Sequence, residues 1–293
     1  MDSVRGTTSL TTHETTTERT NYGRFVSYED DGFKIRANNA ADLYKINRVS
    51  NNFVAWNWKA LDHDRNLHGI NTDGSITTQV SANPAAGFSI ASYRGVGYPN
   101  ATTATVGHGL SQAPDLVIIK GTGGTGQSSG AGSWVVGTGV LASDNWLGSL
   151  YLNSTGTYYT AVNYFWNGSP TSSVVKLKND WFVNGANNTY IMYSWHTVAG
   201  YSKVGVYSGT GISGKEVTLD FSPSFVLIKR TNATAGWIIV DDQRSTYELY
   251  PHVGNQEDTT TTSIVLGTNK FTINSTGTWY NATGGTYLYM AFS

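Results

Sequence analysis

The sequence contains no cysteine, and charged side chains are scarce in it. Without cysteine among its 293 residues the chain can form no disulfide, no thiolate nucleophile and no cysteine-bound zinc site. Only 13% of the residues are charged, and 19 Lys and Arg stand against 20 Asp and Glu. Proteins that bind nucleic acid through its phosphates carry a basic surplus, so this balance argues against such a partner.

Long apolar runs are also missing. No segment approaches the ~20 consecutive apolar residues that a transmembrane helix needs. The first twenty residues are polar and lack the apolar core of a secretory signal peptide. We therefore expect neither insertion into a membrane nor export through such a signal.

Glycine, hydroxyl side chains and aromatic residues are plentiful instead. The chain has 33 glycines, and Phe, Trp and Tyr together make up 13% of it. Its apolar segments are four to eight residues long and are bounded by Gly, Asn, Ser and Thr, which is typical of many short β-strands. The pattern therefore predicts an all-β protein.

Internal repeats are the strongest signal in the sequence. APDLVIIK at residues 113–120 and SPSFVLIK at residues 222–229 share a proline, four apolar residues and a lysine six positions after the proline. A tryptophan followed by apolar residues comes next in both places, as SWVV at 133–136 and GWIIV at 236–240. Such self-similarity indicates a repeated structural unit.

Each repeat closes on an aromatic segment. NNTYIMYSWHTV occupies residues 187–198 and GGTYLYMAFS occupies residues 284–293. We therefore predict two complete repeats, at residues 87–198 and 199–293. A third aromatic segment of this kind, NNFVAWNWKA, occupies residues 51–60.

The beginning of the chain matches the second half of a repeat. DSVR at residues 2–5 corresponds to DDQR at residues 241–244, and the aromatic segment follows in both copies. Residues 1–60 are therefore predicted to be the C-terminal half of a first repeat, joined by a polar connector at residues 61–86. Because half a module leaves an apolar face open to water, we expect residues 1–60 to dock on a neighbouring repeat or on another chain.

The aromatic segments are predicted to be closing strands of the core. Side chains alternate between the two faces of a strand, so Tyr287, Tyr289 and Ala291 share one face and Leu288, Met290 and Phe292 the other. Both faces are apolar or aromatic, which is typical of a sheet that is covered on both sides. The predicted architecture is a series of tandem β-sandwich repeats of jelly-roll type, two complete and one an N-terminal half.

The repeated motifs resemble a known family. PSFVLIKRT, GWIIVDDQR, the DGF or NKF turn and the ending GGTYLYMAFS resemble a repeat of tail-fibre and other virion-associated proteins of tailed bacteriophages, especially phages of aquatic bacteria such as cyanobacteria. The resemblance covers nearly the whole chain and is densest in residues 200–293. It implies a non-enzymatic virion component for structure and host attachment, made in the host cytoplasm and assembled with other virion proteins, usually as a homotrimer. Two alternatives stay open: a capsid decoration or other structural protein of the virion, and a polysaccharide depolymerase.

Catalytic and metal-binding patterns are weak. No pair of acidic residues recurs in a setting typical of a glycosidase, so we predict no catalytic residue, no enzyme activity and no cofactor. His63 and His68 in DHDRNLH are metal-ligand types, but their spacing matches no established site and a solvated linker explains them better. The repeated Asp-x-x-Arg is interpreted as an exposed salt bridge, worth no more than about 1 kcal/mol.

A glycan site is the sharpest hypothesis. Sugars bind against aromatic faces with amides nearby, and the repeats pair several aromatics as core: Trp134 with Trp237, Trp181 with Phe33 and Phe271, and Trp58 with Trp195 and Phe292. The aromatics left unpaired lie in loop-like segments, where function tends to sit on a β scaffold. These candidate ligand-binding residues are Trp146, Tyr158, Tyr159, Tyr164, Trp166 and Trp279. The alternative for each is packing on a loop or on a neighbouring subunit.

Overall fold

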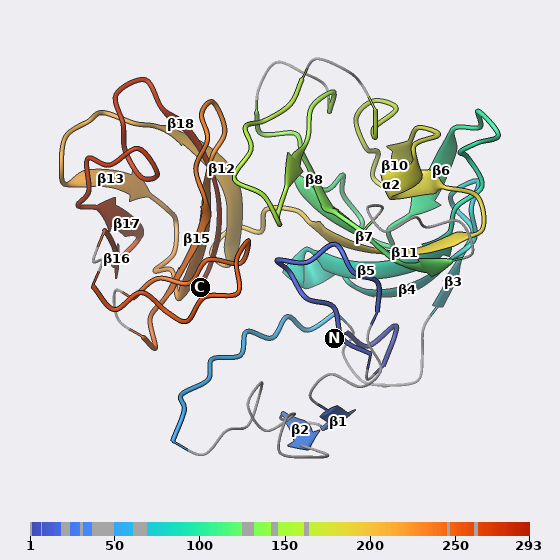
Figure 1. Ribbon diagram of the computed structural model, residues 1–293, viewed down its shortest axis with the longest axis horizontal. Helices are drawn as coiled ribbons and strands as arrows, with labels where there is room; N and C mark the ends of the chain where they lie inside the picture. The colour runs from blue at the N-terminus through green and yellow to red at the C-terminus, as the bar shows by residue number, and fades with distance from the viewer. Residues whose placement is uncertain are drawn as a thin grey trace.

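The computed structural model describes residues 2–6, 8–18, 24–29, 32–36, 50–60, 69–124, 132–141, 146–160, 164–244, 247–260 and 263–293. Within these ranges the chain is almost entirely β-strand and turn, and the paired strands run antiparallel (Figure 1). The described helices are single turns, η1 (Pro84–Ala86) and α2 (Trp181–Asn184). The predicted all-β class is confirmed.

One large sheet and a small sheet opposite it form the first sandwich, which we call the middle module. The large sheet has the order β3-β4-β5-β11-β7-β8-β9. Its strands are β3 (Gly69–Asn71), β4 (Thr78–Asn83), β5 (Phe88–Arg94), β11 (Asn188–Trp195), β7 (Leu116–Gly124), β8 (Trp134–Thr138) and β9 (Leu150–Tyr151). The small sheet pairs β6 (Ala104–Gly107) with β10 (Val174–Leu177).

A second sandwich, the last module, follows the same strand order. Its larger sheet has the order β12-β18-β14-β15, which corresponds to β5-β11-β7-β8 of the middle module. These strands are β12 (Ser202–Ser208), β18 (Thr286–Phe292), β14 (Phe225–Arg230) and β15 (Trp237–Asp241). The smaller sheet joins β13 (Lys215–Thr218), β17 (Lys270–Ile273) and β16 (Ile264–Gly267). The repeat boundaries at residues 87, 198 and 199 stay a prediction.

The closing strands β11 and β18 are buried on both faces, as predicted. In β18, Tyr287 and Tyr289 pack with Phe271 in a core inside the last module. Leu288 and Phe292 point the other way, into a core that the last module shares with the middle module. The two modules are therefore joined by a continuous apolar core and not by a solvated linker.

Residues 50–60 depart from the prediction, because they do not form a closing strand. They lie in no described sheet, whereas β11 and β18 each have a neighbour on both sides. Every second side chain, from Val54 to Ala60, is still turned inward, while Phe53 is 51% exposed. A strand needs neighbours to satisfy its N–H and C=O groups, and none of the described strands pairs with residues 50–60.

The predicted connector is also corrected. Residues 61–68 lie outside the described residues, but residues 69–86 contribute β3, β4 and η1 to the middle module. Ile76, Thr78 and Val80 are buried at every second position, which is the periodicity of a half-buried strand. The polar residues between them made this segment resemble a connector in the sequence.

The proposed equivalence of Trp181 and Phe271 is wrong. Phe271 is fully buried in the strand β17, whereas Trp181 begins the helix α2. The hairpin of β1 (Arg24–Tyr28) and β2 (Phe33–Arg36) does keep Phe33 in the strand that corresponds to β17.

The first residues dock on the middle module. Trp134 Nε1 donates a hydrogen bond to Thr11 O at 3.0 Å, and Glu18 N donates to Thr122 O at 3.1 Å. Lys120 Nζ adds a bond to Glu14 O at 3.4 Å. The expected docking of the N-terminal residues on a neighbouring repeat is therefore present for residues 2–18.

The middle module docks on the last module through hydrogen bonds at the equivalent positions. Trp237 Nε1 donates to Tyr151 O at 2.9 Å, and Tyr158 N donates to Thr231 O at 2.7 Å. Lys229 Nζ donates to Thr155 O at 3.1 Å. One docking arrangement is therefore used twice along the chain.

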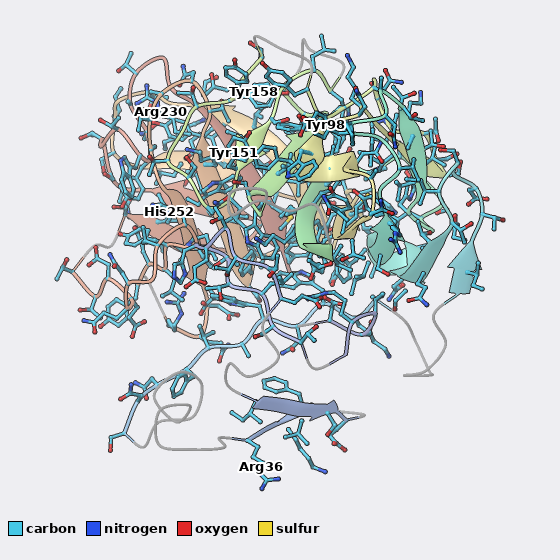
Figure 2. All side chains as sticks on the ribbon, turned by 45° about the vertical axis from the view of Figure 1, so that its right-hand side comes forward. Arg36, Tyr98, Tyr151, Tyr158, Arg230 and His252 are labelled. Atoms are coloured by element: carbon cyan, nitrogen blue, oxygen red, sulfur yellow. The ribbon has the colours of Figure 1, made fainter. Side chains whose placement is uncertain are left out.

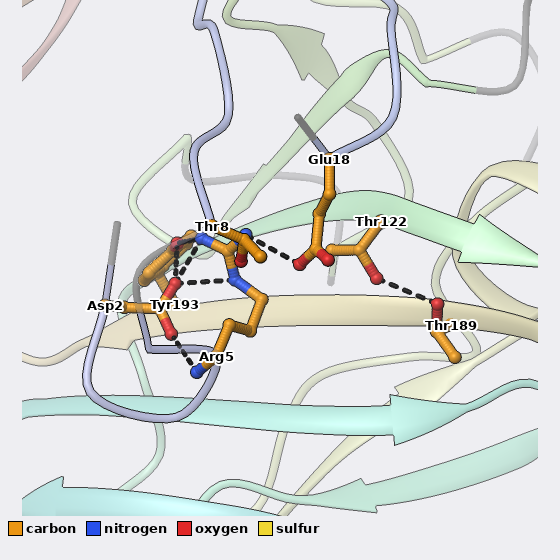
Figure 3. Close-up of polar contacts among 7 residues, drawn as sticks. All are labelled: Asp2, Arg5, Thr8, Glu18, Thr122, Thr189 and Tyr193. Atoms are coloured by element: carbon orange, nitrogen blue, oxygen red, sulfur yellow. Dashed lines mark hydrogen bonds and ion pairs between the residues drawn. The ribbon is translucent and has the colours of Figure 1, made fainter. Parts of the chain in front are cut away.

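The repeated Asp-x-x-Arg forms a salt bridge in both copies, but not an exposed one. Arg5 pairs with Asp2 and Glu18 (Figure 3), and Arg244 pairs with Asp241 at 2.6 Å. Asp2 and Asp241 are both buried. The Tyr193 hydroxyl of β11 also donates to Asp2 Oδ2 at 2.8 Å, a contact that the sequence alone could not indicate.

Candidate functional site

Two of the six predicted ligand residues are core residues. Trp166 is completely buried and Trp146 nearly so, and their rings meet edge to face at 5.5 Å. A Cβ atom at Gly137 of β8 would collide with both rings, whereas the last module has Val240 at this position. The tryptophans fill the space that the glycine leaves. This corrects the expectation that they lie in exposed loops.

Tyr158 and Trp279 also serve packing. Tyr158 lies against the core shared by the two modules, and its main chain makes one of the docking bonds. Trp279 lies in the last module with its ring 5.9 Å from Tyr250 and 6.0 Å from His252, which Figure 2 labels. Neither residue is among the large exposed apolar side chains.

Tyr159 and Tyr164 are at the surface, as the hypothesis requires. Their side chains are 47% and 49% exposed, and their rings are almost parallel with centroids 6.4 Å apart. Tyr159 is held by two hydrogen bonds between its main chain and that of Ser149. The pair is thus an exposed aromatic surface on a fixed backbone.

Ring contacts link this exposed pair, through the buried Phe165, to other aromatic side chains of the middle module. Tyr164 contacts Phe165, Phe165 contacts Phe182 at 5.9 Å, and the neighbouring Trp181 meets Tyr98 edge to face at 5.2 Å. We call this row of residues the aromatic ridge: Tyr159, Tyr164, Phe165, Phe182, Trp181 and Tyr98. The helix α2 connects its two ends, because Trp181 and Phe182 are consecutive in it.

Tyr98 was not among the sequence candidates. It is 47% exposed and follows β5 in a loop of the middle module, where Figure 2 labels it. The last module has Ile212 at the corresponding place after β12, so the same search for unshared aromatics could have found Tyr98.

A polar hollow lies beside this end of the ridge. It measures about 300 Å³ and is open to solvent. Its lining comprises Arg94, Gly95, Val96, Asn100, Ala186 and Asn187. Arg94 Nη2 donates to Asn187 Oδ1 at 3.0 Å, which fixes a guanidinium and an amide at the rim. The hollow thus offers both donors and acceptors next to the exposed ring of Tyr98.

A buried asparagine holds the loop in place. Asn184 Oδ1 accepts from Val96 N at 2.9 Å and from Gly97 N at 3.2 Å, and its Nδ2 donates to Thr102 O at 3.1 Å. Asn281 does the same in the last module, accepting from Thr210 N and donating to Ile212 O, each at 2.7 Å. The short matches VNG at 183–185 and YNA at 280–282 are the sequence signal for this anchor, which was missed.

Comparison with protein families gives a match over the whole chain. A family model described as a domain of unknown function, DUF7483, matches residues 1–293. The chain belongs to the DUF7483 family. No curated protein and no solved structure matches it.

The DUF7483 chain also contains a buried acid cluster that the sequence did not reveal. Glu248 is fully buried and accepts hydrogen bonds from the hydroxyls of Tyr250 at 3.1 Å and Tyr280 at 2.7 Å. The Tyr250 hydroxyl lies 3.1 Å from Asp258 as well. Burial raises the pKa of Glu248 above its ordinary value. A carboxyl group with no solvent access cannot meet a polysaccharide, so this cluster serves the fold.

Metal binding finds no support in the described part of the DUF7483 chain. Its residues include no group of three or more His, Asp or Glu side chains that could hold an ion. His63 and His68 lie outside the described residues, so the weak candidates stay untested. No helix among the described residues is long and apolar enough to cross a membrane.

Proposed function

We propose that this chain is a non-enzymatic component of a tailed-phage virion, of the tail-fibre type, that attaches to a host-surface glycan through the aromatic ridge. The sequence resemblance supports the virion assignment. The observation that carries the glycan assignment is the exposed, parallel pair of Tyr159 and Tyr164, together with the half-exposed Tyr98 beside a polar hollow.

The chemistry of the ridge suits a sugar. Aromatic faces pack against the C–H faces of a pyranose ring, while a few fixed polar groups orient its hydroxyls. Arg94 and Asn187 supply such groups at the rim of the hollow. The ridge belongs to loops of the middle module that differ from those of the last module, so recognition is added to the shared scaffold without changing it.

The proposal also sets the location and the partners. Such a protein lies at the surface of the particle, in a tail fibre, and contacts other virion proteins. Assembly as a homotrimer follows from the family resemblance. In a capsid decoration or other virion structural protein, the alternative role, the ridge would be a contact between subunits.

A glycan array tests the attachment role. We expect the wild-type chain to bind a surface glycan and the Tyr159→Ala/Tyr164→Ala variant to bind at least tenfold more weakly, because aromatic contacts contribute about 0.5–1.5 kcal/mol each beyond burial. Tyr247→Ala is the matched control, since Tyr247 is 37% exposed on the last module. Its binding should equal that of the wild type.

Other outcomes of the array contradict the proposal. If none of the proteins binds any glycan, the chain has no attachment role of this kind and the structural alternative holds. Binding that is equally strong in the ridge variant and in the wild type would remove the ridge as the site. Trp166→Ala is unsuitable as a probe, because this ring is core and its loss would disturb the fold.

A further inference from the structure

Arg94 is the one charged side chain among the described residues that line the polar hollow of the middle module. It stands at the end of β5 and is exposed to solvent. Its Nη2 group donates to Oδ1 of the neutral Asn187 at 3.0 Å, and no carboxylate in the described part of the chain forms an ion pair with it. The positive charge of this guanidinium is therefore not neutralised by the described residues.

The hollow has an excess of hydrogen-bond donors. The other N–H groups of Arg94 and the Nδ2 group of Asn187 make no hydrogen bond to a described residue. The backbone N–H groups of Val96 and Gly97 are already bonded to Asn184, so recognition rests on the two side chains. A planar guanidinium matches a carboxylate, because it can donate two parallel N–H···O bonds to the two oxygens.

The fold itself does not require this pair of side chains. Counted from the stacked tyrosine pairs of the two modules, Ser208 stands in the place of Arg94 and Gly284 in the place of Asn187. Asn187 and Gly284 have φ angles of 65° and 71°, a conformation that glycine adopts without strain and asparagine less easily. The last module thus builds the same turn without a guanidinium or an amide, which points to a ligand as the reason for the pair.

Apolar surface lies next to the charge. Tyr98 and Val96 are each half-exposed, and Val96 lines the hollow. The ring of Tyr98 meets Trp181 edge to face, and its main chain bonds to Asn184 O at 3.1 Å and to Ala186 N at 2.7 Å. The hollow measures about 300 Å³, at the lower end of the range for small-ligand sites. This size suits one sugar unit at the edge of a fixed aromatic ring.

We propose that the hollow selects an acidic sugar unit, with its carboxylate on Arg94 and Asn187 and its ring against Tyr98. This inference rests on the proposed attachment to a glycan and narrows the ligand to glycans that contain a uronic acid. A neutral sugar offers no charge to the guanidinium, so its hydroxyls gain little over the water that they displace. The hollow therefore discriminates by charge, whereas Tyr159 and Tyr164 contribute aromatic contact to either kind of glycan.

Glycans in an acidic and a neutral form test the proposal. The probes are oligosaccharides of glucuronic, galacturonic or mannuronic acid, each arrayed beside the same oligosaccharide with its carboxyl groups reduced to alcohols. We expect the wild-type chain to bind at least one acidic form roughly tenfold more tightly than its reduced form, because hydrogen bonds to charged groups are the stronger ones. Arg94→Gln should bind both forms equally, since it keeps an amide but has no charge.

Two further variants sharpen the result. Arg94→Lys keeps the charge without the planar fork, so its preference should lie between those of the wild type and Arg94→Gln. Arg230→Gln is the matched control, because Arg230 also bonds to a neighbouring amide, Asn232 Oδ1 at 3.1 Å, but lies in the last module, where Figure 2 labels it. It removes the same charge from the chain and should keep the preference of the wild type.

The outcomes separate this inference from the proposed function. Equal binding of both forms by the wild type, or a preference that persists in Arg94→Gln, would overturn the acidic ligand while the attachment role stands. Loss of the preference in Arg230→Gln would also overturn it, because net charge and not the hollow would then decide. Tighter binding to a sulfated glycan without uronic acid would assign the hollow to another anion. If the wild type binds no glycan at all, both proposals fail.

Discussion

Buried ion pairs are the most distinctive feature at the scale of single residues. The spacing Asp, Arg three residues later and Glu thirteen residues after that occurs twice, and both copies make the same contacts. The pairing could be predicted from the sequence, because Asp-x-x-Arg is local. Its burial could not, since the groups that cover Asp2 come from a strand almost two hundred residues away, at Tyr193.

Replacing Arg244 tests how much the buried ion pair with Asp241 contributes to the free energy of unfolding. Arg244→Ala leaves the buried carboxylate of Asp241 without its partner, so we expect a loss of about 3–5 kcal/mol in the free energy of unfolding. Lys270→Ala breaks the exposed pair with Glu216 and should cost less than about 1 kcal/mol. Denaturant unfolding measures both. Equal losses would mean that Asp241 is solvated in the folded chain.

At the scale of elements, the docking segments place one lysine of each module among backbone carbonyls. Lys120 and Lys229 are fully buried, and Lys229 Nζ donates to Ala235 O at 2.5 Å as well as to Thr155 O. The sequence revealed these lysines as repeated positions after an apolar strand. It did not reveal their partners, because one carbonyl of each set, that of Glu14 or of Thr155, belongs to the preceding copy.

These lysines predict a pH dependence of stability. Burial lowers the pKa of each from 10.5 to about 8, so between pH 8 and 10.5 the unfolded chain binds more protons than the folded one. The free energy of unfolding should therefore rise from pH 8 to 9.5, by on the order of 1 kcal/mol, and show no such slope below pH 8. Above about pH 10 the buried tyrosines, whose pKa values are raised, reverse the slope.

Denaturant midpoints at pH 7.5, 8.5 and 9.5 measure this slope. The Lys120→Met/Lys229→Met variant keeps the length of both side chains but has no ammonium group, so its midpoint should stay flat over this range. A variant that keeps the slope of the wild type would assign the dependence to other groups.

A strand was predictable from its sequence pattern wherever the strands that pair with it lie in the same module. The two faces of β18 followed from alternation alone, because both flanking strands are present. The same alternation at residues 50–60 predicted a strand, but no described strand pairs with these residues. Trp181 was misassigned because a match of three letters, NDW with NKF, concealed the better match around Asn184 and Asn281.

At the scale of the whole molecule, the two sandwiches and residues 50–60 share a core. Ala60, Trp195 and Phe292 belong to the same apolar cluster although they come from different copies. The sequence predicted closing strands with two apolar faces but not the shared core, because contacts between modules depend on side chains that no internal comparison aligns. The candidate site was also predictable only in part. Tyr159 and Tyr164 could be found as aromatics that the other module lacks. The burial of Trp166 could not be predicted, because it depends on the space left by Gly137 in another strand.

Hydrogen–deuterium exchange of the full chain tests this account most directly. Residues 188–195 and 286–292 should exchange slowest and at similar rates, because both strands are central and hydrogen-bonded on both sides. Residues 51–58 carry the same aromatic pattern but should exchange rapidly. Slow exchange at residues 51–58, or a large difference between the two closing strands, would contradict an arrangement in which β11 and β18 are central strands and residues 51–58 lie outside any sheet.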